Sequence, residues 1–338
     1  MAITEKQLLS DLKANQFKPI YLLTGEENYY IDLIADYFEN NIVAEECRDF
    51  DLSVVYGKDV DVRTIVSLAQ QCPMLSPRKI VLVREAQDLS IRSEKDWESL
   101  VAYLDHPTDF SSIVLCFKYK SLDKRTKVYK SIDKVGAVFE KKRLYDNEVP
   151  GWIGTYVYNK GFQITEKAAL LIAEFLGNDL GKIVNELSKL FIGLAPGETI
   201  NEVLIERNIG ISKDYNVFEL QKAIGRRDVV KCNRIVNYFA ANSKNNPIQK
   251  ILPLLYSYFI KVMIYIQEPD KTKAASVLKV PPSFVSDYAV AANNYSLSKL
   301  VSCIGYLYDA DLRSKGIRNA GTVTDGEILK ELVFKIIH

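Results

Sequence analysis

The stretch Ser67–Val83, SLAQQCPMLSPRKIVLV, sets the fold expected for the first part of this chain. It predicts the end of an amphipathic helix, a short loop bracketed by Pro73 and Pro77, and a buried strand. Pro73 lacks a backbone N–H and disfavours helix at Cys72, so the helix should end there. Pro77 restricts the residue before it in the same way, and we therefore expect a stiff turn between the two prolines.

Two large apolar side chains, Met74 and Leu75, occupy the centre of this loop, where polar residues are usual. Apolar side chains held out on a turn cost free energy in the free protein, so a pocket on a partner is a natural explanation. Methionine adds adaptability, because its unbranched thioether repacks easily in a groove. The alternative is that both side chains fold back onto the core of their own domain. The two residues alone leave both interpretations open.

The bulk composition is that of an ordinary globular protein. The chain has 338 residues, which suggests two or three domains, with 48% hydrophobic and 26% charged residues. No apolar run reaches the roughly 18 residues needed to cross a bilayer. The N-terminus carries charges and no signal-peptide core, so we expect a cytoplasmic protein without a membrane partner.

Histidines and cysteines give no basis for a catalytic or metal site. The two histidines are His106, in a loop pattern, and the C-terminal His338. The five cysteines are far apart, without a CxxC pair, and we expect them to be reduced and mostly buried. We therefore predict no catalytic residue, no metal and no cofactor. The net charge of +1 implies that any DNA contact comes from a local patch or from a larger assembly.

The N-terminal part alternates between apolar strand patterns and amphipathic helix patterns. Continuous apolar strands separated by helices predict a mostly parallel sheet covered on both faces. We predict its strands at residues 19–23, 49–55, 80–83, 113–117 and 137–139.

The turn after the first strand is where a phosphate-binding loop would lie, but the required residues are missing. Gly25 is followed by Glu26 and Glu27, without the second glycine, the lysine or the hydroxyl of GxxxxGK[ST]. Thr24 and Glu27 have the spacing of a capping box, and the acidic pair would repel a triphosphate. Arg84 follows the third strand, where an acidic magnesium ligand would be expected. We infer a nucleotide-binding architecture that does not bind nucleotide; an unrelated α/β domain is the alternative.

After Val149 the strand patterns vanish and amphipathic helices follow. Thr199 and Glu202 again have capping-box spacing, and residues 210–214 are the expected hinge into a last helical domain. Between Lys118 and Arg143 ten residues are basic and three are acidic. That segment could contact DNA phosphates or an acidic neighbour; a solvated helix face is the alternative.

Several stretches, in this order and spacing, resemble the delta subunit family of bacterial DNA polymerase III, the clamp-opening subunit of the clamp loader. They are YLLTGEENYYIDL (21–33), SLAQQCPMLSPRKIVLV (67–83), SLDKRTKVYK (121–130), GNDLGKIVNELSKL (177–190), NVFELQKAI (216–224) and LYDADLRSKG (307–316). The resemblance covers essentially the whole chain. It implies an α/β plus all-α fold: an AAA+-like parallel-sheet domain over residues 1–145, a small helical lid over 146–211 and a helical collar for oligomerisation over 212–338.

The resemblance also implies a function. Family members bind the sliding clamp (the beta subunit) through a hydrophobic pair that falls on Met74 and Leu75, after Pro73, and open it for loading onto primed DNA. Some relatives have an aromatic residue where Leu75 stands. The implied partners are the other loader subunits, tau/gamma and delta prime, within a DNA-directed DNA polymerase holoenzyme. No arginine-finger Ser-Arg-Cys sequence occurs, which fits a subunit that neither hydrolyses ATP nor completes a neighbour's site. The alternatives are an AAA+ family ATPase with a degenerate loop and a DNA-binding adaptor of replication or repair.

Overall fold

The computed structural model describes residues 3–195, 197–209, 215–317 and 323–338. The chain forms two compact units, one made of Met1–Val149 with Asn178–Asn185 and the other of Pro150–Gly177 with Glu186–His338. The expected hinge at 210–214 lies outside the described residues. The division into three domains at residues 145 and 211 stays a prediction.

A five-stranded parallel sheet forms the centre of the first unit, in the order β2-β3-β4-β1-β5. Each neighbouring pair is parallel, as the continuous apolar runs predict. Parallel strands all begin at one edge of the sheet and end at the opposite edge. The strands are β1 (Ile20–Gly25), β2 (Leu52–Tyr56), β3 (Lys79–Arg84), β4 (Ser111–Lys118) and β5 (Ala137–Lys141).

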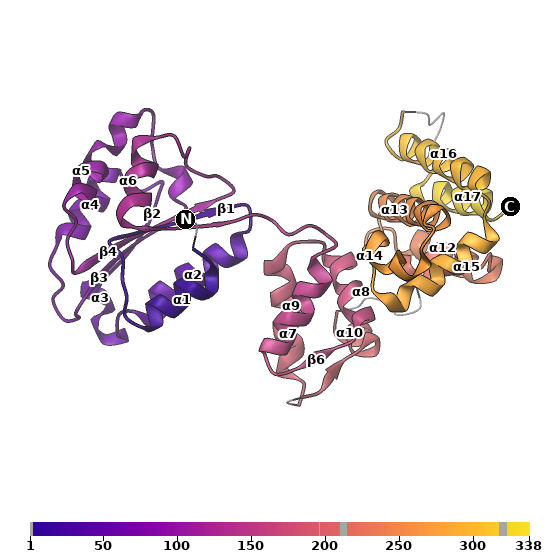
Figure 1. Cartoon of the computed structure of the whole chain (residues 1–338), viewed down its shortest axis with the longest axis horizontal. Coiled ribbons are helices and arrows are strands. Elements are labelled where there is room, and N and C mark those ends of the chain that lie inside the picture. The colour runs from indigo at the N-terminus through magenta and orange to yellow at the C-terminus, as the bar shows by residue number, and fades with distance from the viewer. Residues whose placement is uncertain (1–2, 196, 210–214, 318–322) are drawn as a thin grey trace. The chain divides into compact units, whose positions relative to one another are not determined.

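Helices cover both faces of this sheet (Figure 1). The helices α1 and α2 lie on one face, and α4, α5 and α6 lie on the other. The helices are α1 (Glu5–Lys13), α2 (Asn28–Asn41), the short α3 (Arg48–Asp51), α4 (Val62–Gln70), α5 (Glu98–Asp105) and α6 (Lys127–Val135), with 3-10 turns at Glu45–Cys47, Ala86–Asp88 and Glu94–Trp97.

Alternate residues of each strand face the two helical layers, which is why the central strands β1, β3 and β4 carry apolar residues at consecutive positions. In β1, Ile20 and Leu22 join the core under α4, α5 and α6. Tyr21 points to the other face, where its ring lies 4.8 Å from the ring of Phe38 in α2. Burial on both faces leaves the two edges of the sheet, and the loops there, as the places for polar or binding side chains.

Among the described residues from Val149 onward, the structure has helices and two short strands that the sequence did not predict. β6 (Gln163–Ile164) and β7 (Thr199–Ile200) pair in parallel, and two residues are too few to show an alternating pattern. The expectation of no strand after Val149 was therefore wrong. The first helices here are α7 (Val149–Asn159), α8 (Glu166–Leu176), α9 (Leu180–Ile192) and α10 (Glu202–Ile209).

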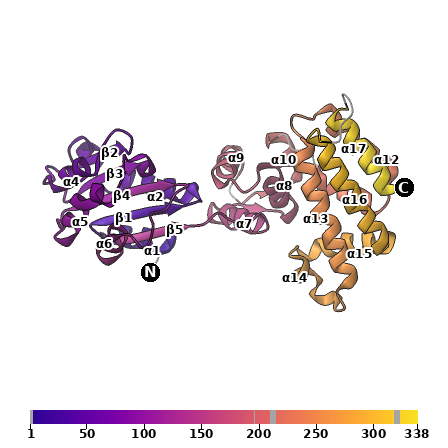
Figure 2. The same ribbon diagram turned by 90° about the horizontal axis from the view of Figure 1, so that it is seen from above.

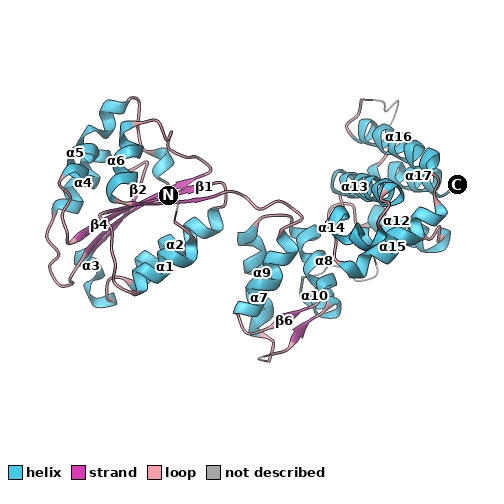
Figure 3. Cartoon of the chain, in the orientation of Figure 1, coloured by secondary structure: helices cyan, strands magenta, loops and turns pink. Residues whose placement is uncertain are grey.

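The C-terminal helices pack around one apolar core. Figure 2 shows α13, α16 and α17 side by side, and Figure 3 shows strands among the helices of the first unit but none in this bundle. The bounds are α11 (Val217–Gly225), α12 (Val229–Ala241), α13 (Ile248–Gln267), α14 (Ala274–Leu278), α15 (Val285–Asn294), α16 (Leu297–Ser314) and α17 (Asp325–Ile337), with 3-10 turns at Lys271–Lys273 and Pro282–Phe284.

Local details differ from the sequence prediction at two helix starts. Thr24 belongs to β1, and its hydroxyl donates to the Lys120 carbonyl at 2.9 Å instead of capping α2. Glu27 caps α2. Thr199 belongs to β7, and the side chain of Asn201 accepts from two amides of the first turn of α10. Both predicted capping boxes were wrong, because strand pairing had already engaged the threonines.

The start of the second strand also differs from the prediction. Asp49–Asp51 lie in α3, and the strand runs from Leu52. Cys72, one of the five cysteines expected to be mostly buried, lies beyond the end of α4 and is exposed. Among the described residues, no helix is both long and apolar enough to span a membrane.

Candidate functional site

The loop between α4 and β3 lies at the edge where the strands of the sheet begin. α4 ends at Gln70 and β3 starts at Lys79, so the loop comprises residues 71–78. The helix stops before Pro73, in agreement with the effect of proline on the residue before it. The loop therefore has the position that the sequence predicts.

Met74 and Leu75 lie on the surface of this loop. Their exposed fractions are 73% and 59%, whereas Pro73 is half-buried. The alternative in which both side chains fold back onto their own core is therefore wrong. An exposed apolar pair on a stiff loop is the kind of surface that a partner's pocket would cover.

A buried carboxylate holds the loop from the inside. Asp51, the last residue of α3, has a relative exposure of 0%. Its Oδ1 accepts the N–H of Met74 at 2.6 Å, and its Oδ2 accepts the N–H groups of Leu75 at 2.8 Å and of Ser76 at 2.6 Å. The sequence analysis missed Asp51, because a single acidic residue far along the chain from the loop gives no local signal.

Both ends of the loop are tied to neighbouring segments as well. The Lys79 ammonium donates to the Phe50 carbonyl at 3.1 Å and to Oε1 of Gln71 at 3.2 Å. The Arg78 guanidinium donates to the Asp109 carbonyl at 2.7 Å. These bonds connect the loop to α3, to the end of α4 and to the segment before β4, which keeps its backbone in one arrangement.

At the opposite edge, where the strands end, the turn after β1 is closed by β5. Gly25 has a φ of +129°, and a Cβ there would lie 2.1 Å from the Lys141 carbonyl oxygen. The amides of Glu26 and Glu27 both donate to that carbonyl, at 3.0 and 3.3 Å. A phosphate-binding loop leaves such amides for its ligand. Here the Lys141 carbonyl of β5 accepts the hydrogen bonds that a phosphate oxygen would otherwise accept.

Glu27 occupies the N-terminus of α2 itself. Its Oε1 accepts the Tyr29 N–H at 3.3 Å, and the residue is 5% exposed. Burial raises the pKa of Glu27 above its ordinary value, and the bond from Tyr29 works in the opposite direction. The N-terminus of α2, which could otherwise bind an anion, is therefore already capped by the side chain of Glu27.

Ion pairs fill the space beside this turn. The Arg84 guanidinium, at the end of β3, pairs with Asp36 and Glu39 of α2 at 2.6 Å each. The Lys118 ammonium, at the end of β4, pairs with Asp32 at 2.8 Å. Burial opposes the charge on Arg84, but its hydrogen bonds with the two carboxylates raise its pKa. These three carboxylates are already paired with cations, where a nucleotide site would need a carboxylate for magnesium.

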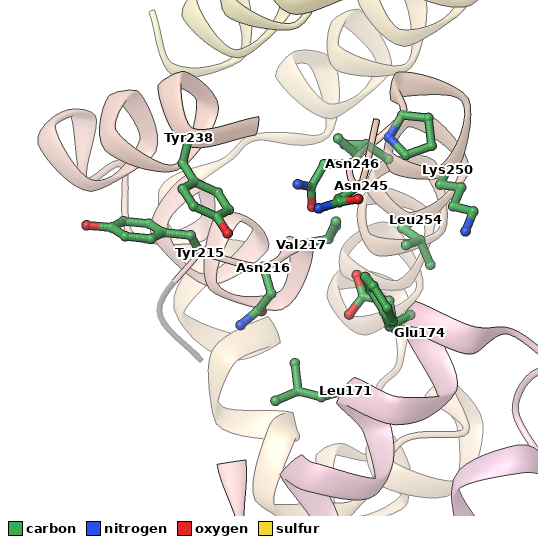
Figure 4. A pocket seen from close by; sticks show the side chains of 13 residues that line it. Leu171, Glu174, Tyr215, Asn216, Val217, Tyr238, Asn245, Asn246, Lys250 and Leu254 are labelled. Carbon is green, nitrogen blue, oxygen red and sulfur yellow. The ribbon is translucent and has the colours of Figure 1, made fainter. Parts of the chain in front are cut away.

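A cavity of about 70 Å³ lies in the second unit (Figure 4). Glu174 of α8 lines it together with Tyr215, Asn216, Tyr238 and Lys250. Among the residues that the structure describes, the buried Oε2 atom of Glu174 has no hydrogen-bond partner. Burial raises the pKa of Glu174 to about 8, so this carboxyl holds its proton at neutral pH. The sequence analysis did not single out this residue.

The basic segment 118–143 starts at the edge where β4 ends, opposite to the edge with Met74. Part of its charge is paired internally, Lys124 with Glu140 at 2.7 Å and Arg125 with Asp123 at 2.6 Å. Three exposed lysines lie along one face of α6: Lys127, Lys130 and Lys134. α6 leads back to the start of β5, which β1 and β4 separate from β3 in the sheet, so the basic segment lies apart from the loop of Met74 and Leu75.

The remaining expectations concern histidine, cysteine and metals. His106 is exposed and follows α5, as a turn residue would. Cys116, Cys232 and Cys303 are buried, and burial raises the pKa of the Cys116 thiol to about 12. The part of the chain that the structure describes contains no cluster of His, Cys, Asp and Glu suited to a metal ion.

Comparisons with known proteins agree with one another. Residues 21–142, which include the loop, match the family described as DNA polymerase III, delta subunit. The DNA polymerase III subunit delta of Bacillus subtilis (strain 168) is 25% identical over 280 residues, which are 80% of this chain and 80% of that protein. The solved structure of the Bacillus subtilis DNA clamp loader delta protein (YqeN) superimposes with a TM-score of 0.54 at 22% identity, and 99% of each chain is covered.

The structural likeness concerns the fold, and it confirms the expected α/β plus all-α class, with a parallel-sheet domain followed by helical parts. The sequence matches concern descent, and one of them extends over four-fifths of the chain. Together they show what this chain is similar to: residues 21–142 match the family of DNA polymerase III delta subunits, and four-fifths of the chain align with one curated delta subunit.

Proposed function

We propose that this chain binds the sliding clamp, the beta subunit, through Met74 and Leu75 and opens it for loading onto primed DNA. The observation that carries the proposal is the exposure of this pair, 73% and 59%, on a loop held by buried Asp51. Pro73 contributes by restricting the backbone before Met74. The family gives the identity of the partner, and the family match includes the loop.

Opening would follow from binding alone. A subunit that fits an open clamp better than a closed one shifts the ring towards the open form by the difference in affinity. This step needs no ATP in the chain itself, which agrees with a turn whose amides donate to Lys141 and with carboxylates already paired with Arg84 and Lys118. The chain is proposed to be a non-catalytic part of the polymerase holoenzyme.

The other loader subunits, tau/gamma and delta prime, are the proposed partners of the helical collar at 212–338, with the lid at 146–211 between collar and clamp-binding domain. Primed DNA would be reached through the assembled loader, in the cytoplasm. In this proposal the collar contacts the other loader subunits, and the loop between α4 and β3 contacts the clamp.

The proposal is tested with the double variant Met74→Ala/Leu75→Ala and the sliding clamp of the same organism. Truncating two apolar anchors at the centre of an interface should cost at least about 2 kcal/mol, roughly a thirtyfold weaker affinity. Surface plasmon resonance on the immobilised clamp measures the affinity. A fluorescence assay of clamp opening should show the same loss.

A matched control removes exposed apolar side chains elsewhere. Ile192 and Val230 are 88% and 62% exposed in the second unit, so Ile192→Ala/Val230→Ala removes a similar amount of surface. This control should bind the clamp as the wild type does. Equal affinity of the wild type and the Met74/Leu75 variant would rule out the assignment.

A further inference from the structure

Three consecutive backbone amides converge on one buried carboxylate in the first unit. The two oxygens of Asp51 accept the N–H groups of Met74, Leu75 and Ser76 at 2.6, 2.8 and 2.6 Å. Successive amides that point at one centre form an anion-binding concavity. In this case the anion belongs to the protein, 23 to 25 positions earlier in the chain.

The two prolines explain why a single carboxylate is enough. Pro73 and Pro77 have no N–H, so Met74, Leu75 and Ser76 supply all the backbone donors from residue 73 to residue 77. Asp51 accepts every one of them. A backbone donor left unpaired would draw the loop towards water or towards another partner. Here the buried carboxylate of Asp51 accepts all three N–H groups.

The charge on Asp51 has no counter-ion among the described ion pairs. Burial favours the protonated carboxyl, but the amide bonds from the loop outweigh it and lower the pKa of Asp51 below its ordinary value. Lys79, the charged side chain tied to the same helix, bonds the Phe50 carbonyl and not the carboxylate. The loop amides are thus what makes an ionised Asp51 tolerable at 0% exposure, and the two depend on each other.

The outward direction of the apolar pair follows from this arrangement. With their N–H groups directed inward to Asp51, Met74 and Leu75 keep 73% and 59% of their surface exposed. A flexible loop would have to lose backbone and side-chain freedom on binding, which typically costs about 0.5–1.5 kcal/mol for each side chain immobilised. A loop fixed in advance avoids most of that cost.

We propose that Asp51 is a positioning residue: its carboxylate fixes the backbone of Met74–Ser76 so that Met74 and Leu75 are ready to enter the partner's pocket. The part concerning the partner rests on the proposed clamp binding; the part concerning the loop does not. Asp51 itself is buried, so we expect it to act through the loop and not by touching the partner.

The test uses Asp51→Asn, with Asp49→Asn as the control for the change of charge. Asparagine keeps the shape but has one acceptor oxygen, and its NH₂ group would face an N–H donor. Asp49 is exposed and two residues away. Hydrogen exchange measured by NMR on the full chain should show slow amides at Met74, Leu75 and Ser76 in the wild type and in Asp49→Asn. In Asp51→Asn these amides should exchange at least about tenfold faster.

Clamp binding provides the second measurement. Asp51→Asn should weaken it by about tenfold, the equivalent of ordering one or two side chains. In the Met74→Ala/Leu75→Ala background the same substitution should have no further effect, because the side chains that it positions are gone. An equal loss in both backgrounds would mean that Asp51 only supports the fold, and the inference would be wrong.

The outcomes separate this inference from the proposed function. If the Met74/Leu75 variant binds the clamp normally, the proposed function fails, whatever Asp51 does. If that variant loses binding while Asp51→Asn keeps full affinity and slow exchange, only the present inference fails. Should Asp51→Asn not fold, the wild type still decides the structural part: fast exchange of the three amides would overturn it.

Discussion

At the scale of single residues, buried charged side chains hold the loop that exposes Met74 and Leu75. Asp51 and Lys79 are both buried, charged side chains, and each is engaged with the backbone of this region. Charged groups are buried only when hydrogen bonds compensate them, so each binds its segment firmly. The hydrogen bonds of Asp51 and Lys79 thus fix the segments around the exposed side chains of Met74 and Leu75.

Phe50 is a further exposed apolar residue whose backbone is tied to the end of this loop. It directly precedes Asp51, is 49% exposed and has its carbonyl bonded to Lys79 at the end of the loop. We expect Phe50→Ala to weaken clamp binding by about 1–2 kcal/mol, roughly five- to thirtyfold, because an aromatic ring beside two anchors adds contact area. Titration of labelled clamp measures it.

Tyr56 is the matched control for Phe50. It is 47% exposed and lies at the other end of β2, the edge opposite to the loop. Tyr56→Ala should leave clamp affinity unchanged. If both variants bind alike, Phe50 has no part in the contact.

At the scale of elements, the sequence predicted strands and helices from their repeating apolar patterns. It missed single hydrogen bonds between segments that are far apart in the chain. The sequence patterns gave all five strands of the sheet, and the signal is continuous in β1, β3 and β4, which are buried on both faces. Proline chemistry gave the end of α4 and the exposed loop. The bonds of Asp51 and of the Lys141 carbonyl join segments far apart in the chain, and no local pattern announces such partners. The caps Glu27 and Asn201 were missed for the same reason, since strand pairing decided which side chain was left for the helix.

Glu174 in helix α8 should make the free energy of unfolding depend on pH. Burial raises its pKa to about 8 from a model-compound value of 4.5. Between these values the unfolded chain gives up the proton while the folded chain keeps it, so the free energy of unfolding falls as pH rises. Glu174→Gln removes this loss. Its stability relative to the wild type should therefore improve steadily from pH 5 to pH 8, measured by urea unfolding.

Glu166→Gln, on the exposed start of the same helix, controls for the removal of a carboxylate. Its difference from the wild type should vary little over that range. A Glu174→Gln variant whose difference from the wild type were the same at pH 5 and pH 8 would show that the carboxyl titrates normally.

At the scale of the whole molecule, the two edges of one sheet have opposite characters. The edge where strands begin presents Met74 and Leu75, and the edge where strands end is closed by the Lys141 carbonyl and the ion pairs of Arg84 and Lys118. Loops after the strands of an open parallel sheet usually hold the ligand. Here the exposed pair lies on the other side, which fits a chain that acts by holding another protein.

The closed edge leads to a prediction for the full chain: ATP with magnesium should not stabilise it. A site with a Kd one-hundredth of the ATP concentration would add about 2.7 kcal/mol and raise Tm by several degrees, which differential scanning calorimetry detects easily. Tripolyphosphate is the control, because the basic segment 118–143 can attract any polyanion. The chain should show no shift with ATP beyond that seen with tripolyphosphate. A larger, magnesium-dependent shift with ATP would mean that the amides of Glu26 and Glu27 leave the Lys141 carbonyl for a phosphate, and that this chain keeps a working nucleotide site.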